Sequence, residues 1–117
     1  MFLFSLSDNH YLAELVAAGL AIPLSSHEER NFEDGEFSAR TLIGVRGEDV
    51  YALQSLHGGT DRSTNDKICR LAFFAVTLKE NGARRVTAVV PYLAYARKHR
   101  QTKTRDPVRT RYLALLL

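Results

Sequence analysis

The pattern of apolar and polar positions at the start of the chain predicts a strand followed by a helix. Residues 1–5 form a short apolar run suited to a buried strand. Apolar residues then recur at helical spacing up to Leu20, after a cap at Asp8 or Asn9. Gly19 is placed where a left-handed residue would end this helix.

The middle of the chain shows the pattern of strands joined by tight turns. Residues 37–43 and 50–56 have strand-like composition and spacing. The dipeptide Asp34-Gly35 predicts a tight turn before them, because glycine accepts the positive φ that such turns demand.

A second helix is expected from a cap at Ser63 or Thr64 to about Glu80, closed by Asn81-Gly82. At about 100° per residue, its apolar side chains cover well over half of the helix circumference. A helix covered on one side only needs a narrower stripe. We therefore expect this helix to pack on the sheet and also to contact something else, such as another subunit.

The last third of the chain predicts a strand, a basic loop and a third helix. The strand covers residues 85–90, and Asp106-Pro107 forms an N-cap and first-turn pair for the helix. Three leucines end the chain without a capping glycine, so we expect the domain to be incomplete at its C-terminus. Strands that alternate with helices predict one α/β domain over residues 1–117, with a mostly parallel sheet flanked by helices.

The composition is that of a globular protein, with 45% hydrophobic and 25% charged residues among 117. No apolar run approaches the roughly 18 residues needed to cross a bilayer, and the start lacks the features of a secretory signal. Cys69 is the only cysteine, so no internal disulfide is possible, and we expect it to be a small core residue. The four histidines lack metal-ligand spacing. These features predict a cytoplasmic protein without a membrane segment and without a metal site in this chain.

The net charge of +3 hides a strong local excess of positive charge. Residues 97–111 contain seven basic residues and one acidic residue, whereas the rest of the chain contains nine basic and twelve acidic residues. The segment therefore contributes +6 and the remainder −3. Such a concentration indicates an anionic partner, either phosphate groups or nucleic acid.

Two segments could form a binding site. The first, residues 31–36, presents the ring of Phe32 and nearby carboxylates on a turn, where the ring could stack on a base and the carboxylates could accept hydrogen bonds from it. The alternative is a solvated turn with Phe32 folded back into the core. The second, residues 90–100, begins where a parallel strand ends, and Arg97 and Lys98 could hold phosphate oxygens there. Its alternative is a solvated basic loop.

In their order along the chain, FEDGEF, VRGEDVYALQS, TND, RVTAVVPYLAYAR and RDPV resemble the ribose-phosphate diphosphokinases, also called phosphoribosyl-pyrophosphate synthetases. The resemblance covers residues 1–117 and is strongest over 32–36, 45–55 and 84–108. It implies a domain of the type I phosphoribosyltransferase fold, a homo-oligomer such as a dimer or hexamer, and transfer of pyrophosphate from ATP to ribose 5-phosphate with Mg²⁺. The matching part is the N-terminal domain, without the second, ribose-phosphate-binding domain.

The resemblance also assigns a site shared between two subunits. Phe32 would stack on adenine, and the turn residues after it would lie at the base or its sugar. Arg97 would contact the phosphates from the neighbouring subunit. The residues that the resemblance assigns to ATP binding are Phe32, Asp34, Gly35, Glu36, Arg97 and Lys98.

Three positions depart from the pattern of the family. Lys98-His99 replaces the usual Gln-Asp pair, and because lysine cannot accept a hydrogen bond, Lys98 is suited to phosphate and not to an amide-type contact with adenine. Arg70 takes the place of a usual glutamate, and Arg109 that of a small hydroxyl residue. These changes indicate a divergent branch or a relative that has lost catalysis.

The leading hypothesis is a fragment of an ATP-dependent pyrophosphokinase that is inactive alone. By resemblance, the catalytic loops and the histidine that binds magnesium lie beyond residue 117, so no catalytic residue is assigned to this chain. The alternatives are a non-catalytic regulatory or nucleotide-binding homologue and a nucleic-acid binder that uses residues 97–111. Nucleic acid is the less favoured partner because no recognition motif is present.

Overall fold

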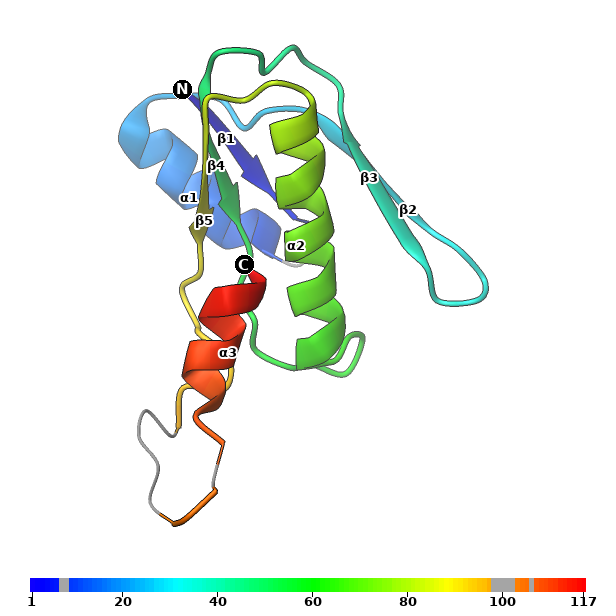
Figure 1. Ribbon diagram of the computed structural model, residues 1–117. Coiled ribbons are helices and arrows are strands. Elements are labelled where there is room, and N and C mark those ends of the chain that lie inside the picture. Colours follow the sequence, from blue (N-terminus) through cyan, green and yellow to red (C-terminus); the bar gives the residue numbers. More distant parts are fainter. Residues whose placement is uncertain (7–8, 98–102, 106) are drawn as a thin grey trace.

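The computed structural model describes residues 1–6, 9–97, 103–105 and 107–117 as one α/β domain (Figure 1). The strands are β1 (Phe2–Ser5), β2 (His27–Asn31), β3 (Phe37–Thr41), β4 (Asp49–Leu53) and β5 (Arg85–Val89). The helices are α1 (His10–Leu20), α2 (Thr64–Glu80) and α3 (Arg109–Leu116). Within this part of the chain, no helix is both long and apolar enough to span a bilayer.

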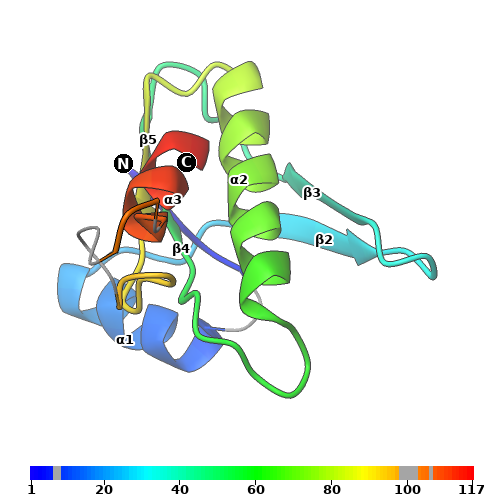
Figure 2. The same ribbon diagram turned by 60° about the horizontal axis from the view of Figure 1, so that its bottom comes forward.

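Three parallel strands in the order β1-β4-β5 form the central sheet, as the alternation of strands and helices predicts. Helix α1 covers one face and α2 the other (Figures 1 and 2). The strand residues alternate accordingly: Phe4 belongs to the core cluster on the α2 side, and its neighbour Leu3 packs with Ala13 and Ala17 of α1. The α2 side is the larger core, where the rings of Phe4 and Phe74 meet edge to face at 5.4 Å.

Strands β2 and β3 form a separate antiparallel hairpin, which does not join the parallel sheet. The hairpin lies beside α2 and projects away from the sheet (Figure 1). The sequence pattern predicts a strand over residues 37–43, where β3 lies, but it assigns no strand to β2 and does not predict this separation. Alternation alone does not identify a strand's partner.

Helix α2 confirms the predicted bounds. The Ser63 hydroxyl accepts a hydrogen bond from the Asp66 amide at 3.1 Å and so caps the first turn. At the other end Gly82 adopts φ +91°, a conformation that suits glycine. Local chemistry at both ends therefore determines this helix.

Helix α1 ends later than Gly19 predicts. Ala21 adopts the left-handed conformation with φ 54°, and the amide of Ile22 donates to the carbonyl of Ala17. Ile22 packs against the α1-side core, so tertiary packing moves the helix end two residues beyond the glycine.

Helix α3 begins later than the Asp106-Pro107 pair predicts. Its N-cap is Val108, which makes no side-chain capping bond, and the helix starts at Arg109. Pro107 therefore lies outside the first turn, and Asp106 lies outside the described residues. The burial of Leu113, one helical turn into α3, fixes the helix against the core.

The wide apolar surface of α2 is buried on one side only. Leu71, Phe74 and Leu78 are fully buried against the sheet, whereas Phe73 and Val76 are 55% and 56% exposed. Cys69 is also exposed, so the prediction of a core cysteine is wrong. It lies on the side of α2 that borders α3, where a cavity leaves it accessible.

At the edge of the sheet opposite the strands' carboxyl ends, Asp49 pairs with Arg84. The guanidinium donates two hydrogen bonds to the carboxylate, at 3.0 and 2.8 Å, and these bonds lower the pKa of Asp49 below its ordinary value. The pair ties the start of β4 to the residue that precedes β5.

Candidate functional site

The tip of the β2–β3 hairpin is a three-residue turn closed by backbone hydrogen bonds. The amide of Phe32 donates to the carbonyl of Glu36, and the amide of Gly35 donates to the carbonyl of Phe32, both at 3.0 Å. Gly35 adopts φ +92°, as the Asp34-Gly35 dipeptide predicts. Asp34 Oδ1 accepts a further hydrogen bond from the amide of Glu36 at 3.0 Å, so side chain and backbone together fix the turn.

The ring of Phe32 lies at the surface of this tip. It is 42% exposed and belongs to neither core cluster, so the alternative of a ring folded back into the core is wrong. The guanidinium carbon of Arg30 lies 5.3 Å from its centroid. One side of the ring thus carries a cation, and the ring remains accessible at the end of the hairpin.

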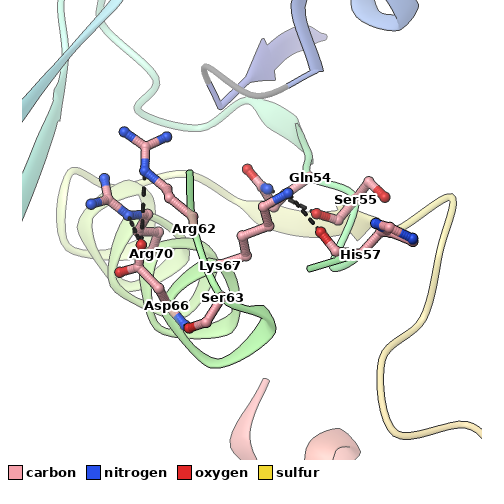
Figure 3. Close-up of polar contacts among 8 residues, drawn as sticks. All are labelled: Gln54, Ser55, His57, Arg62, Ser63, Asp66, Lys67 and Arg70. Carbon is pink, nitrogen blue, oxygen red and sulfur yellow. Dashed lines mark hydrogen bonds and ion pairs between the residues drawn. The ribbon is translucent and has the colours of Figure 1, made fainter. Parts of the chain in front are cut away.

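The hairpin is attached to α2 through Arg70, which contacts the strand end next to the tip. The guanidinium carbon of Arg70 lies 4.3 Å from the centroid of the Phe37 ring, and its Nε donates to Asp66 Oδ2 at 3.0 Å. Arg70 is only 6% exposed, and Arg62 lies near the same carboxylate at 3.8 Å (Figure 3). A buried cation is costly unless paired, and this one is paired with a carboxylate and an aromatic face. Its Nη1 atom is buried without a hydrogen-bond partner among the described residues.

A polar pocket of about 590 Å³ lies where β4 and β5 end. Parallel strands place their carboxyl ends at one edge of the sheet, which is the usual position of ligand crevices in α/β folds. The loop after β4, the start of α2, the segment after β5 and the start of α3 all contribute to it. Its lining residues are His57, Gly58, Thr64, Tyr92, Leu93, Ala94, Tyr95, Ala96, Arg97 and Arg109.

Backbone and side-chain bonds hold the walls of this pocket together. Lys67 of α2 donates from Nζ to the carbonyl of His57 at 2.6 Å and so holds the loop after β4 against the helix (Figure 3). The amide of Leu56 donates to the carbonyl of Tyr92 at 3.1 Å, and the rings of His57 and Tyr92 meet edge to face at 5.1 Å. The two loops that follow adjacent strands therefore form one wall.

Tyr95 connects the pocket to both neighbouring helices. Its hydroxyl hydrogen bonds to Asn65 Oδ1 of α2, and the guanidinium carbon of Arg109 lies 5.6 Å from its ring centroid. Its backbone adopts φ 59°, which is rare for a residue with a bulky side chain and is often found at functional sites.

Buried polar groups lie just behind the pocket at the same sheet edge. Gln54 is fully buried, and its Nε2 donates to the carbonyl of Ser55 at 2.9 Å (Figure 3). Asn9 accepts a bond from the Ser55 amide at 3.1 Å. Gln54 Oε1 and Asn9 Nδ2 have no partner among the described residues, which is uncommon for buried polar atoms.

A second cavity, of about 580 Å³, opens between α2 and α3 on the side that exposes Phe73 and Cys69. Its lining is almost entirely apolar, apart from Asn65 and Arg109. It provides space but few groups that could orient a polar ligand.

The structure brings the predicted site residues together in two places. Phe32, Asp34, Gly35 and Glu36 share the hairpin tip, and Arg97 lines the pocket. In both views α2 lies between the hairpin and α3, so tip and pocket do not meet within one molecule (Figures 1 and 2). Lys98 lies outside the described residues.

Sequence reasoning did not assign His57, Thr64 or Arg109 to a site, although all three line the pocket. The signal for His57 and Thr64 is a glycine-containing loop between a parallel strand and a helix. The signal for Arg109 is its position in the basic segment 97–111, which does not by itself place the residue in this pocket.

The described residues do not fit a magnesium site. No group of three histidine, cysteine, aspartate or glutamate side chains gathers among them, and one oxygen of Asp34 is already bonded to the Glu36 amide. Magnesium prefers several oxygen ligands in octahedral arrangement. This part of the chain does not supply such a set.

A parallel sheet with helices on both faces and a pocket at its carboxyl edge defines the chain as an open α/β domain with a candidate ligand site at the usual position for this class. The family described as the N-terminal domain of ribose phosphate pyrophosphokinase matches residues 1–117, and the chain belongs to this family.

Individual relatives agree with this assignment. The chain is 40% identical over 111 residues to a ribose-phosphate pyrophosphokinase of Granulibacter bethesdensis, a match that covers 95% of this chain and 34% of that protein. A ribose-phosphate pyrophosphokinase of Brucella melitensis is 39% identical over 117 residues, with 100% and 36% covered.

A crystal structure of phosphoribosylpyrophosphate synthetase from Mycobacterium smegmatis superimposes with a TM-score of 0.89 at 31% identity, over 98% of this chain and 37% of that one. The likeness confirms the predicted fold class. The chain spans about a third of the length of the curated relatives it matches.

Proposed function

We propose that this chain is the ATP-binding part of a ribose-phosphate diphosphokinase and that it binds ATP between two copies of itself. The hairpin tip of one copy supplies Phe32 as a stacking surface for adenine and Asp34 and Glu36 as acceptors near the base or sugar. The pocket of the other copy supplies Arg97 to the phosphates. The placement of the exposed ring on one side of α2 and the basic pocket on the other is the observation that supports this arrangement.

The proposed chemistry is binding and orientation. Stacking and charge-assisted hydrogen bonds fix the base and the phosphate chain, which is the main contribution of proteins to transfer of phosphoryl-type groups. Magnesium would neutralise charge on the phosphates when bound. Transfer of pyrophosphate to ribose 5-phosphate needs positioning groups that lie outside these 117 residues by resemblance, so the chain alone is expected to make no product.

Calorimetric titration with ATP tests the site. Phe32→Ala is expected to weaken binding roughly 10- to 100-fold, because stacking of a base on an aromatic ring contributes about 1–3 kcal/mol. Arg97→Ala should weaken it by about tenfold or more, since charge-assisted hydrogen bonds contribute about 1.5–3 kcal/mol.

Two exposed residues away from both halves provide matched controls. Tyr11→Ala removes an aromatic ring that is 80% exposed on α1, and Arg111→Ala removes an exposed cation on α3. Both should leave the affinity for ATP within about twofold, as expected for surface substitutions. If neither Phe32→Ala nor Arg97→Ala weakens the binding of ATP, the assignment of these residues to a nucleotide site is wrong.

The same binding site would serve a non-catalytic homologue, and product formation separates the two possibilities. Adding ATP, magnesium and ribose 5-phosphate to the chain should yield no AMP. AMP formed in amounts matching a phosphoribosyl product would contradict the expectation that the chain is inactive alone.

A further inference from the structure

Arg109 opens α3 and lines the same pocket as Arg97, which belongs to the segment after β5. We propose that Arg109 is a second phosphate-binding residue of this pocket, which is therefore built for a polyphosphate chain and not for a single phosphate group. This inference rests on the proposed function, because it names the part of the nucleotide that the pocket binds.

The charge of the pocket lining supports a polyanion. The lining contains two arginines and one histidine, and no acidic side chain is among the described lining residues. At about 590 Å³ the pocket is in the usual size range for small-molecule sites, and it is large enough for more than one phosphate group. Two guanidinium groups at different walls can each bind oxygens of a different phosphate in a two-pronged manner.

The start of α2 adds to the positive potential of this pocket. Thr64, the first residue of this 17-residue helix, lines the pocket. The aligned peptide dipoles of a helix give its N-terminus a partial positive charge. Gly58 lies directly against Thr64, where a Cβ atom would come within 3.0 Å of the threonine hydroxyl oxygen. The backbone of the loop therefore stays close to the helix start, and both remain near the arginines.

Tyr95 orients Arg109 toward this position. The tyrosine is bonded to Asn65 of α2, and its ring lies 5.6 Å from the guanidinium carbon of Arg109. A cation–π contact of this kind uses no N–H donor of the guanidinium group in a hydrogen bond. Arg109 can therefore bind phosphate while it rests on the ring, with less side-chain freedom to lose than an unstacked arginine has.

Inorganic tripolyphosphate, which lacks base and sugar, is the probe that isolates this pocket. In calorimetric titration of the 117-residue chain, Arg109→Gln is expected to weaken tripolyphosphate binding by about tenfold or more. Arg109→Lys keeps the charge but loses the two-pronged geometry, so a loss of only a few-fold is expected. Arg111→Gln, two residues along the same helix and outside the pocket lining, should change the affinity by less than about twofold.

Circular dichroism and thermal unfolding of each variant show whether a loss of binding comes from a loss of folding. If Arg109→Gln disturbs α3, Arg109→Lys still tests the position, because lysine keeps a cation beside the Tyr95 ring. Equal losses for Arg109→Gln and Arg111→Gln would overturn the proposal in favour of general charge attraction. Absence of tripolyphosphate binding by the parent chain would also overturn it. A single-stranded oligonucleotide that binds more tightly than tripolyphosphate, and whose affinity falls equally in Arg109→Gln and Arg111→Gln, would overturn the proposal and assign the surface to nucleic acid.

The outcome of this experiment can be distinguished from that of the test of the proposed function. Tripolyphosphate has no base to stack on Phe32, so Phe32→Ala should leave its affinity unchanged. Suppose that Phe32→Ala leaves the affinity for ATP unchanged while Arg109→Gln weakens tripolyphosphate binding. The proposal of a shared ATP site would then be wrong, and the proposal of a polyphosphate pocket would be supported. If Phe32→Ala weakens ATP binding while Arg109→Gln leaves tripolyphosphate binding unchanged, the role of Arg109 is contradicted and the shared ATP site is supported.

Discussion

At the scale of single residues, the candidate site depends on a few residues whose backbone conformation is unusual. Gly35 at the hairpin tip and Tyr95 at the pocket both have positive φ, at 92° and 59°. Glycine adopts this conformation without steric cost, whereas tyrosine adopts it only when its surroundings favour it. For Tyr95 these surroundings are the bond to Asn65 and the stacked Arg109.

Gly35→Ala tests the role of the turn in presenting Phe32. A Cβ at this position meets no atom within 4 Å, so the expected cost of about 1 kcal/mol comes from the backbone alone. Urea denaturation should show this loss, and ATP affinity should fall because the tip is distorted. Gly59→Ala is the matched control, because Gly59 also has open space around its Cβ position but no positive φ. Equal effects of the two substitutions would show that the turn conformation is unimportant.

At the scale of elements, sequence reasoning succeeds where local chemistry decides and fails where packing decides. The bounds of α2 follow from the Ser63 cap and Gly82, and both are visible in the sequence. The end of α1 depends on the packing of Ile22 against residues distant in sequence, so the helix continues past Gly19, where the sequence predicted its end. The same reason explains the site: the turn at Gly35 is local and was predictable, whereas the position of Arg109 in the pocket was not.

The attachment of the hairpin to α2 depends on Arg70. Arg70→Ala removes the cation beside Phe37 and the partner of Asp66, and we expect it to lower the free energy of unfolding by roughly 2 kcal/mol. Amide hydrogen exchange in β2 and β3 should become faster relative to the central sheet, because the hairpin loses its contact with the helix.

Lys79→Ala is the matched control, since Lys79 is an exposed cation in the last turn of the same helix. It should leave both measurements nearly unchanged. Unaltered protection of the hairpin amides in Arg70→Ala would show that other contacts hold the hairpin.

At the scale of the whole molecule, the two halves of the candidate site are separated by α2 (Figure 2). One copy therefore offers an aromatic tip on one side of α2 and a basic pocket on the other. Exposed apolar residues such as Phe73 and Val76 lie on α2, and Leu115 and Leu116 on α3. A second copy that brings its hairpin to the pocket of the first would complete the site, which is why the proposed function requires a homo-oligomer.

Mixing two variants that are each deficient in ATP binding tests this central claim most directly. Phe32→Ala and Arg97→Ala are each expected to lose most ATP binding alone, but after equal amounts are mixed and allowed to exchange subunits, about a quarter of the sites should combine an intact tip with an intact pocket. Calorimetric titration of the mixture should then show high-affinity sites in that proportion. A mixture that binds ATP no better than either variant alone would contradict a site shared between two copies.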